Sequence, residues 1–359
     1  MDERIKLQFW AIMRGEKRGI GPSIVVLILF GFSGLYGLFI WVRNLLFTIK
    51  VLSAQKFSIP VISVGNIVVG GAGKTPIVIW LLELLKEKGL KAVVLTRGYM
   101  DNDPTGKKLF SDEAEVIKQM VPDAQVVVGA ERFKCGQEYL KTNKADVFIL
   151  DDGFQHRQIN RDLDLVAVDA TNPWGNGSLL PSGLLREPIS SLKRAQVVIL
   201  TKTDLMEKDS ADAFKSVENV NSEMLICRGV HKPVGFFDVR AGTWHKEDLI
   251  DGKIVGYFCS IADPRSFKRT LEHLGACVLK GFDFIDHHSY VDEDFKNINT
   301  GCNVEKIKIL VTTRKDAVKI GAYLKFLASD IQILVLDIRF NIPEGKEQLV
   351  ARIDSLFIH

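Results

Sequence analysis

A glycine-rich stretch that follows an apolar run decides how this chain folds: residues 59–76 read IPVISVGNIVVGGAGKTP. We expect residues 59–64 to form a strand, residues 65–73 to form a loop, and Lys74-Thr75-Pro76 to open a helix. A strand, a glycine-rich loop and a helix N-terminus in this order are the context of a phosphate-binding loop. The glycines let the backbone approach a phosphate closely, and the N–H groups and the helix dipole favour an anion there.

The loop provides the residues that we assign to the nucleotide phosphates: Val69, Gly70, Gly71, Ala72, Gly73, Lys74 and Thr75. In such loops the lysine reaches the β- and γ-phosphates and the threonine hydroxyl binds Mg²⁺. The strict pattern G-x-x-x-x-G-K-[ST] is not met, because Val68 occupies the position of its first glycine. A tight glycine turn beside a helix is the alternative, but Lys-Thr at the required place favours the phosphate loop.

Apolar runs and helical stretches alternate after this loop, with strand-like runs at 59–64, 92–95, 125–128, 146–150, 163–168 and 196–200. One helix is expected at 75–88, with Pro76 in its first turn and Gly89 just past its end. Buried strands that alternate with helices predict a mostly parallel sheet covered by helices on both faces.

A second set of strand-like runs lies at 253–258, 277–281, 307–312 and 332–336, beyond an expected break near His231-Lys232-Pro233. A last helix is expected around 344–356. The length of 359 residues suits two α/β domains. We predict a membrane-associated helical segment at 1–56, a P-loop NTPase-like nucleotide-binding domain at 57–232, and a smaller α/β domain at 233–359 that closes over the site.

The N-terminal segment has no charged residue from 19 to 42, and residues 24–42 read IVVLILFGFSGLYGLFIWV. About 20 apolar residues suffice to cross a bilayer. Basic residues flank the run on both sides, so a span with its catalytic part in the cytosol would put a basic N-terminus outside, against the usual charge bias. We therefore favour a helix lying in the cytoplasmic leaflet, with a true span or a buried core helix as alternatives.

Composition narrows the class of protein further. The net charge of +3 is too small to indicate a nucleic-acid partner. The cysteines are odd in number and never spaced as C-x-x-C, which fits a reducing compartment better than a disulfide framework or a zinc site.

A second acidic element follows the apolar run 147–150, which ends in Asp151-Asp152-Gly153. Apolar residues that end in a carboxylate resemble a Walker-B strand, which delivers negative charge to the edge where Mg²⁺ binds. Neighbouring strand residues point to opposite faces, so Asp151 and Asp152 are not expected to do the same job. Helix-capping or turn aspartates are the alternative for one of them.

These motifs together closely resemble the lipid A disaccharide 4′-kinases. The resemblance rests on residues 64–76 (VGNIVVGGAGKTP), 96–99 (TRGY), 151–156 (DDGFQH), 174–188, 286–288 (DHH) and 312–319 (TTRKDAVK). It implies transfer of the γ-phosphate of ATP, with Mg²⁺, to the 4′-hydroxyl of an acylated glucosamine disaccharide 1-phosphate. It further implies that this lipid A precursor is phosphorylated at the cytoplasmic face of the inner membrane.

The resemblance also implies roles for single residues. Glu187 joins Asp151 or Asp152 at the metal, and Asp112 accepts the proton of the attacking hydroxyl with His287 as its partner. From the residues alone, helix capping by Asp112 and surface exposure of His287 would be the simpler interpretations. The candidates for binding the substrate are Arg97, Tyr99, Arg132, Gln155, His156 and Arg186.

Two other functions fit parts of the sequence. Thr201-Lys202-Thr203-Asp204 resembles the guanine-reading motif of GTPases, although no D-x-x-G switch follows the Asp151 strand. A membrane-bound P-loop GTPase is therefore one alternative. A membrane-anchored scaffold driven by nucleotide hydrolysis is the other.

Overall fold

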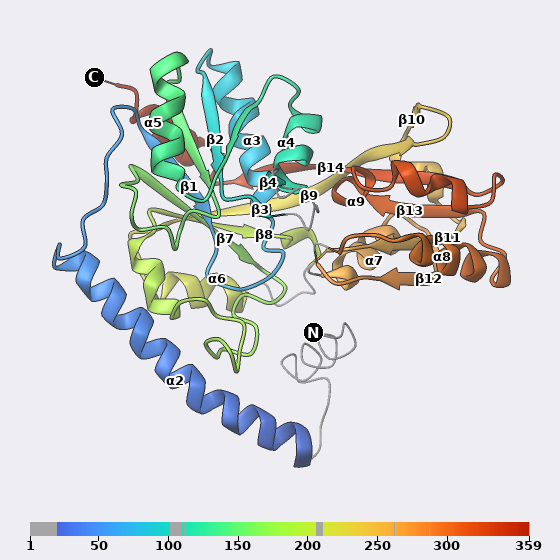
Figure 1. Ribbon diagram of the computed structural model, residues 1–359, viewed down its shortest axis with the longest axis horizontal. Helices are drawn as coiled ribbons and strands as arrows, with labels where there is room; N and C mark the ends of the chain where they lie inside the picture. The colour runs from blue at the N-terminus through green and yellow to red at the C-terminus, as the bar shows by residue number, and fades with distance from the viewer. Residues whose placement is uncertain are drawn as a thin grey trace. The chain divides into compact units, whose positions relative to one another are not determined.

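The computed structural model describes residues 20–100, 109–110, 112–205, 211–261, 263–286 and 288–358 (Figure 1). These residues group into two compact units. The first comprises residues 1–110, 123–230 and 342–359, and the second comprises residues 111–122 and 231–341. The two strands β9 (Leu225–Asp238) and β14 (Gln332–Glu344) carry the chain from one unit to the other.

The first unit contains a parallel sheet in the order β9-β8-β7-β1-β6-β2-β5. Its strands are β1 (Val61–Gly65), β2 (Ala92–Thr96), β5 (Gln125–Val128), β6 (Val147–Asp151), β7 (Leu163–Asp169) and β8 (Val197–Thr201). Its helices are α2 (Ile20–Thr48), α3 (Lys74–Glu87), α5 (Arg132–Thr142), α6 (Ala211–Glu218) and α10 (Lys346–Asp354), with short 3₁₀ turns at Ile189–Arg194 and Thr203–Leu205. A small antiparallel pair, β3 (Tyr99–Met100) and β4 (Leu109–Phe110), stands apart from the sheet.

Helices cover both faces of this sheet, as predicted. Helix α3 links β1 to β2 in one direction along the sheet, and α5 links β5 to β6 in the opposite direction. Right-handed crossovers that run in opposite directions place their helices on opposite faces. The connection from β1 to β2 passes over strand β6, and the connection from β5 ends in it. Each residue of β6 from Val147 to Asp151 is buried.

The second unit is a smaller α/β unit in which β12-β11-β13-β14-β9 form the sheet and β10 pairs antiparallel with β9. Its further strands are β10 (Thr243–His245), β11 (Ile254–Cys259), β12 (Cys277–Asp283) and β13 (Ile309–Thr313). Its helices are α4 (Asp112–Met120), α7 (Pro264–His273), α8 (Asp292–Val304) and α9 (Arg314–Ala317), with 3₁₀ turns at Glu247–Ile250 and Gly321–Phe326.

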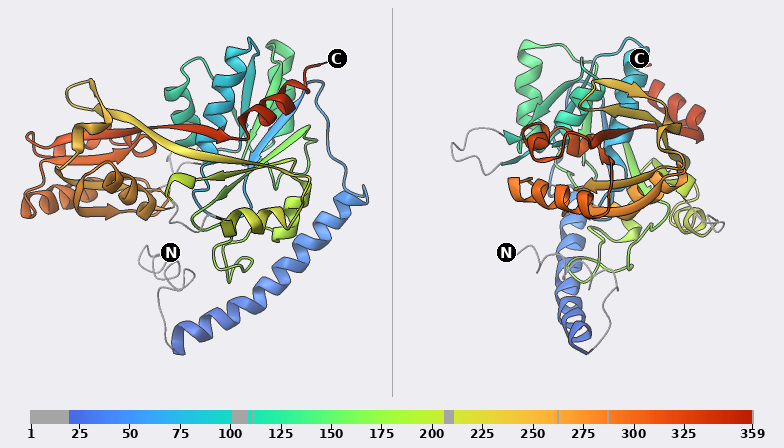
Figure 2. Two further views of the ribbon diagram at one scale, coloured as in Figure 1. Left: turned by 180° about the vertical axis from the view of Figure 1, so that it is seen from behind. Right: turned by 90° about the vertical axis from the view of Figure 1, so that its right-hand side faces the viewer.

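The expected division near residues 231–233 coincides with the change from the first unit to the second, which falls between residues 230 and 231. The strand itself is not interrupted there, because β9 runs from Leu225 to Asp238 (Figure 2). Proline usually interrupts a strand because it has no N–H to donate, but it is tolerated on a side of the strand that has no partner there. Among the described strand pairs, β8 follows β9 only as far as Arg228 and the pairing with β10 begins at Phe236, which leaves a gap at Pro233.

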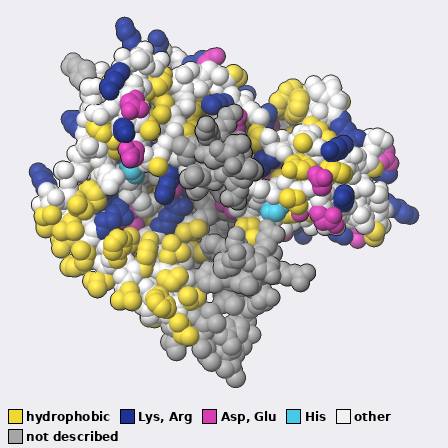
Figure 3. All heavy atoms as spheres, viewed as in Figure 1, with side chains coloured by type: hydrophobic (Ala, Val, Ile, Leu, Met, Phe, Trp, Pro, Cys, Tyr) yellow, Lys and Arg dark blue, Asp and Glu magenta, His cyan; other side chains and the backbone are white. Residues whose placement is uncertain are grey.

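Helix α2 is long and apolar enough to cross a membrane by length and composition, over Ile28–Thr48. Its large apolar side chains are mostly exposed, and hydrophobic atoms gather along this helix on the face seen in Figure 3. A narrower stripe of α2 faces its own unit. Ser33 bonds to Leu179 O at 2.9 Å and to Ser182 Oγ at 2.7 Å, and Tyr36 donates to Arg186 O at 2.8 Å.

Close backbone contact at the end of β1 gives a test of the fold. A Cβ atom on Gly65 would lie 2.4 Å from Phe154 Cβ and 2.6 Å from Phe154 N. Because that backbone cannot move without disturbing the acidic turn, we expect Gly65→Ala to lower the free energy of unfolding by about 2–3 kcal/mol.

Thermal unfolding followed by circular dichroism measures this effect. The matched control is Gly34→Ala in α2, where an added Cβ has nothing within 4 Å and alanine favours the helix. Equal melting temperatures for Gly65→Ala and the control would contradict the predicted close contact.

Candidate active site

The phosphate loop joins the end of β1 to the start of α3. Gly70 and Gly73 have φ angles of 128° and 79°, values that favour glycine. The Thr201 hydroxyl at the end of β8 donates to Ala72 O at 2.9 Å, and Val69 N donates to Leu184 O at 2.7 Å. The loop is therefore held from two sides by parts of the chain that are distant in sequence.

The acidic pair lies at the same edge of the sheet as the phosphate loop. Strands β1 and β6 are parallel neighbours, and Val64 is paired with Asp151. The side chain of Lys74 spans the remaining gap, with its Nζ 3.2 Å from Asp152 Oδ1. The structure thus brings the loop lysine and the acids together as the sequence predicted.

Asp151 and Asp152 have different surroundings, as their positions on the strand predicted. Asp151 is buried and accepts a hydrogen bond from Thr96 Oγ1 at 3.2 Å. Asp152 has a left-handed backbone with φ of 51° and binds Arg186 Nη1 at 2.8 and 3.0 Å. Burial alone would raise the pKa of Asp152, but the cations of Lys74 and Arg186 outweigh burial and hold that pKa well below its usual range.

Asn66 is a functional candidate that the sequence reasoning missed. Its buried side chain accepts a hydrogen bond from Lys74 Nζ at 3.2 Å and donates to Val68 O at 2.6 Å inside the loop. Its backbone oxygen accepts from Gln155 Nε2 at 2.8 Å. An asparagine directly after a buried strand and before the glycines was the available signal, since such a residue can brace the loop from within.

Glu187 occupies a different environment from the one expected of a metal ligand. Its side chain is fully buried, and its Oε2 accepts hydrogen bonds from Arg194 at 2.8 Å and from Asn44 of α2 at 3.0 Å. Its Oε1 has no hydrogen-bond partner among the described residues. These contacts join Glu187 to α2 and to the 3₁₀ turn at Ile189–Arg194. They leave Oε1 for a further ligand.

The expected substrate residues are placed unevenly. Arg132 is buried and donates to Asp152 O at 3.3 Å, so it supports the acidic turn, whereas Arg97 is exposed. Gln155 and His156 lie in the turn after Asp152, next to the phosphate loop. Tyr99 lies in β3, but its side chain is outside the described part of the chain.

The proposed base and its partner also lie outside what the structure describes: the side chain of Asp112 and the whole of His287. Their neighbours in the second unit are described. Lys315 Nζ lies 2.8 Å from Asp286 Oδ1 and 4.0 Å from Glu113 Oε1. One ammonium group therefore contacts both Glu113 and Asp286, the chain neighbours of Asp112 and His287, and this contact was not expected from the sequence.

The position of Lys315 is itself fixed by a buried carboxylate. Asp316 is fully buried and accepts hydrogen bonds from Ser260 N at 3.0 Å, from the Ser260 hydroxyl and from Tyr290 Oη at 2.9 Å. Thr313 Oγ1 binds its other oxygen at 2.6 Å. This network explains why the stretch 312–319 carries an aspartate directly after the lysine.

A glycine loop held at the ends of parallel strands, with its lysine on a carboxylate of the neighbouring strand, defines an α/β protein of the P-loop nucleotide-binding class. The family model for tetraacyldisaccharide-1-P 4′-kinase (LpxK) matches residues 25–357. The chain therefore belongs to the tetraacyldisaccharide-1-P 4′-kinase family, which confirms the resemblance seen in its motifs.

Similar proteins support this membership over nearly the whole chain. A tetraacyldisaccharide 4′-kinase of Syntrophus aciditrophicus is 34% identical over 91% of this chain and 93% of its own length. One from Halothermothrix orenii is 32% identical over 94% and 95%. The crystal structure of Aquifex aeolicus LpxK in its "apo" form in complex with ATP has a TM-score of 0.71 and 28% identity, and covers 93% of this chain and 100% of that one.

The imidazole of His156 gives a test of the electrostatics of the site. Burial and the nearby Arg132, Arg161, Arg43 and Arg97 lower its pKa from 6.5 to about 4. The fold thus favours the neutral ring. The contribution of the neutral His156 ring to the free energy of unfolding is complete above pH 6.5 and is lost as the pH falls through about 4.

NMR of histidine-labelled protein, with the resonance assigned by its loss in His156→Gln, should show a ring that titrates near pH 4. Unfolding of His156→Gln should depend less on pH between about 6.5 and 4 than unfolding of the unmodified protein. Titration near pH 6.5 would mean that the arginines do not surround this ring.

Proposed function

We propose that this chain transfers the γ-phosphate of ATP to the 4′-hydroxyl of an acylated glucosamine disaccharide 1-phosphate, a precursor of lipid A. Family membership supports the reaction, and the similar Aquifex aeolicus structure is titled as a complex with ATP. The observation that carries the proposal is the contact between Lys74 and Asp152 at 3.2 Å. This contact puts the lysine that we assign to the phosphates beside acids that can hold a metal. The GTPase and scaffold alternatives are not favoured by membership of a kinase family.

Phosphoryl transfer depends mainly on positioning and charge neutralisation. We assign the loop Val69–Thr75, including Gly70, Gly71, Ala72, Gly73 and Lys74, to the β- and γ-phosphates. Arg186 is assigned to the same negative charge, because its guanidinium already lies on Asp152 beside Lys74. Binding of ATP would replace Asp152 by phosphate oxygens as the partner of these cations.

Magnesium is proposed as the metal of the reaction. The Thr75 hydroxyl and one or both carboxylates of Asp151 and Asp152 are hard oxygen ligands of the kind that Mg²⁺ prefers. These ligands fit the ion because Asp152 is held ionised by its cationic neighbours. When bound, Mg²⁺ would neutralise charge on the transferred phosphoryl group. Glu187 remains a further candidate ligand through its Oε1, which makes no hydrogen bond to a described residue.

The acceptor hydroxyl needs a group that orients it and takes its proton. We assign this role to Asp112, with His287 as the residue that orients Asp112, on the strength of the family motifs. The support from the structure is Lys315, which pairs with Glu113 and Asp286, the direct neighbours of the two. For the acylated disaccharide we assign Arg97, Tyr99, Arg132, Gln155 and His156 as candidate contacts.

Membrane association at the cytoplasmic leaflet of the inner membrane is part of the proposal. Helix α2 exposes large apolar side chains such as Phe32, Leu38 and Trp41. Ser33 and Asn44 on its other side bind residues of their own unit. A helix with one side occupied by protein cannot be surrounded by lipid, which favours a helix lying in the interface over one that spans.

Labelled ATP tests the reaction. Purified protein in detergent should move the γ-phosphate of ATP onto the acylated disaccharide 1-phosphate, and Lys74→Ala should reduce turnover by at least about a hundredfold. Lys86→Ala, on the same helix but in an exposed ion pair with Asp123, is the matched control and should keep full activity. Label found only in inorganic phosphate, or a preference for GTP, would refute the kinase assignment.

The proposed pair of Asp112 and His287 predicts non-additive kinetics. Asp112→Ala and His287→Ala should each lower kcat, and the double variant should lower kcat by less than the product of the two effects if the residues act as one unit.

Lys315→Met should lower kcat at unchanged KM for ATP, with partial recovery in Lys315→Arg.

The matched control for these variants is Lys308→Met, which removes an exposed lysine of the same unit that is paired with Asp330. It should leave kcat unchanged. Strict multiplicativity of the Asp112 and His287 effects would show that the two residues do not cooperate.

A further inference from the structure

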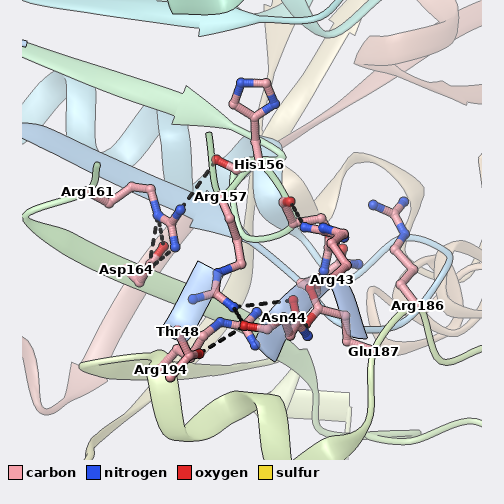
Figure 4. A network of polar contacts seen from close by, with 12 residues as sticks. Arg43, Asn44, Thr48, His156, Arg157, Arg161, Asp164, Arg186, Glu187 and Arg194 are labelled. Carbon is pink, nitrogen blue, oxygen red and sulfur yellow. Dashed lines mark hydrogen bonds and ion pairs between the residues drawn. The ribbon is translucent and has the colours of Figure 1, made fainter. Parts of the chain in front are cut away.

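Several arginines lie where α2 meets two later segments of the chain, residues 156–164 and residues 186–194 (Figure 4). We call this group the arginine cluster; it consists of Arg43, Arg157, Arg161, Arg186 and Arg194. The carboxylates bound to these arginines are those of Asp152, Asp164 and Glu187. Guanidinium groups therefore outnumber the carboxylates that they contact.

Each carboxylate is already used by one arginine. Arg161 binds both oxygens of Asp164, Arg186 binds Asp152, and Arg194 binds Glu187. Arg43 and Arg157 are left without a carboxylate among the residues that the structure describes. The site of interest is formed by these two.

Arg43 and Arg157 instead bind neutral acceptors. Arg43 Nη2 donates to the backbone oxygen of Gln155, and Arg157 Nη1 donates to Asn44 O at 2.9 Å and to Asn44 Oδ1 at 3.4 Å. The guanidinium of Arg157 also lies 5.0 Å from the centre of the Phe47 ring. These contacts fix the position of both arginines, and they use only one nitrogen of each fork.

Such an arrangement leaves a surplus of positive charge in a half-buried place, although the carboxylate of Glu187 attracts both guanidinium groups and raises the pKa of each. Both side chains are partly buried, and burial is the largest cause that lowers the pKa of each. Other guanidinium groups of the cluster, Arg194 and Arg161, add to this lowering, which takes the pKa of Arg157 to about 10. A half-buried cation is stabilised by an anion that brings its own charge and several acceptor oxygens.

The chemistry of the surroundings limits which anion fits. Arg43 lies on α2 one to two residues from Trp41, Val42 and Leu45, whose side chains are exposed and apolar. A guanidinium fork matches the geometry of a phosphate better than that of a simple ion. A phosphate joined to acyl chains would satisfy the arginines and the apolar face of α2 at once.

We propose that Arg43 and Arg157 form a binding site for the phosphate monoester of an acylated lipid, separate from the phosphate loop. The ligand would be either the phosphate that the acceptor lipid already carries or the headgroup of an anionic lipid in the bilayer. The first source rests on the proposed kinase function, and the second does not. Neither arginine touches the reacting atoms in this proposal; both act by binding.

Two assays separate these sources, and both use the full-length protein. The first measures kinetics in a neutral detergent with the acylated disaccharide 1-phosphate and with its analogue that lacks the 1-phosphate. The second measures sedimentation with phosphatidylcholine vesicles, with or without phosphatidic acid, a lipid with a phosphate monoester. The variants are Arg43→Gln, Arg157→Gln and the double variant.

If the acceptor provides the phosphate, Arg157→Gln should raise KM for the phosphorylated acceptor by about ten- to a hundredfold, the worth of a charge-assisted hydrogen bond, and leave KM for the analogue unchanged. If a bilayer lipid provides it, the kinetics in detergent stay normal and the extra binding to vesicles with phosphatidic acid is lost. Arg157→Lys keeps the charge without the fork and should have an intermediate effect.

Two control variants exclude simpler causes. Lys56→Gln removes an exposed positive charge just after α2 and should change neither assay. Phe47→Ala removes the ring that lies under Arg157 but removes no charge, so it shows the effect of loosening α2 alone. Such loosening should affect ligands with and without a phosphate monoester equally. Melting temperature and ATP affinity of each variant show that the unit is folded.

The proposal is overturned if the arginine variants behave like Lys56→Gln in both assays, or if they lose phosphorylated and unphosphorylated ligands alike. If the unmodified protein phosphorylates no acceptor, the kinase function fails. The vesicle assay then still decides whether the arginine pair binds a phosphate monoester.

Discussion

The ion pair between Lys74 and Asp152 is the contact on which the arrangement of this site depends. It joins Lys74, the first residue of α3, to the turn after β6. Helix α3 follows β1, and β1 and β6 are neighbouring parallel strands of one sheet. Two cations, Lys74 and Arg186, share the one carboxylate of Asp152. Their attraction holds the phosphate loop, the acidic turn and the 178–186 segment in place relative to one another.

Close packing makes this arrangement specific. Gly65 and Gly153 have no side chain, so β1 and the acidic turn approach within a distance that a Cβ atom would prevent. The unusual backbone of Asp152, with φ of 51°, directs its carboxylate to Lys74 while Asp151 points toward Thr96. Strained backbone of this kind persists only where the surroundings fix it, and here the two cations do so.

Helix α2 is connected to the same site through polar contacts. Asn44 binds Glu187 and Arg157, and Tyr36 binds the backbone of Arg186, the residue that holds Asp152. A change in how α2 lies on its unit would therefore reach Arg186 directly. This connection gives a physical reason for a helix with an exposed apolar side to be part of the nucleotide-binding unit rather than a detached anchor.

The sequence by itself determined the alternation of strands and helices, the phosphate loop, the acidic pair and the apolar helix, because these depend on local patterns of apolar residues and glycines. Only the tertiary structure decided that β9 continues through Pro233 and that Asn66 and Lys315 support the site. It alone separated Arg43 and Arg157 from the arginines that have carboxylates. The physical reason is that long side chains find partners in segments more than a hundred residues away in the sequence. No local pattern of residues encodes which charged group pairs with which.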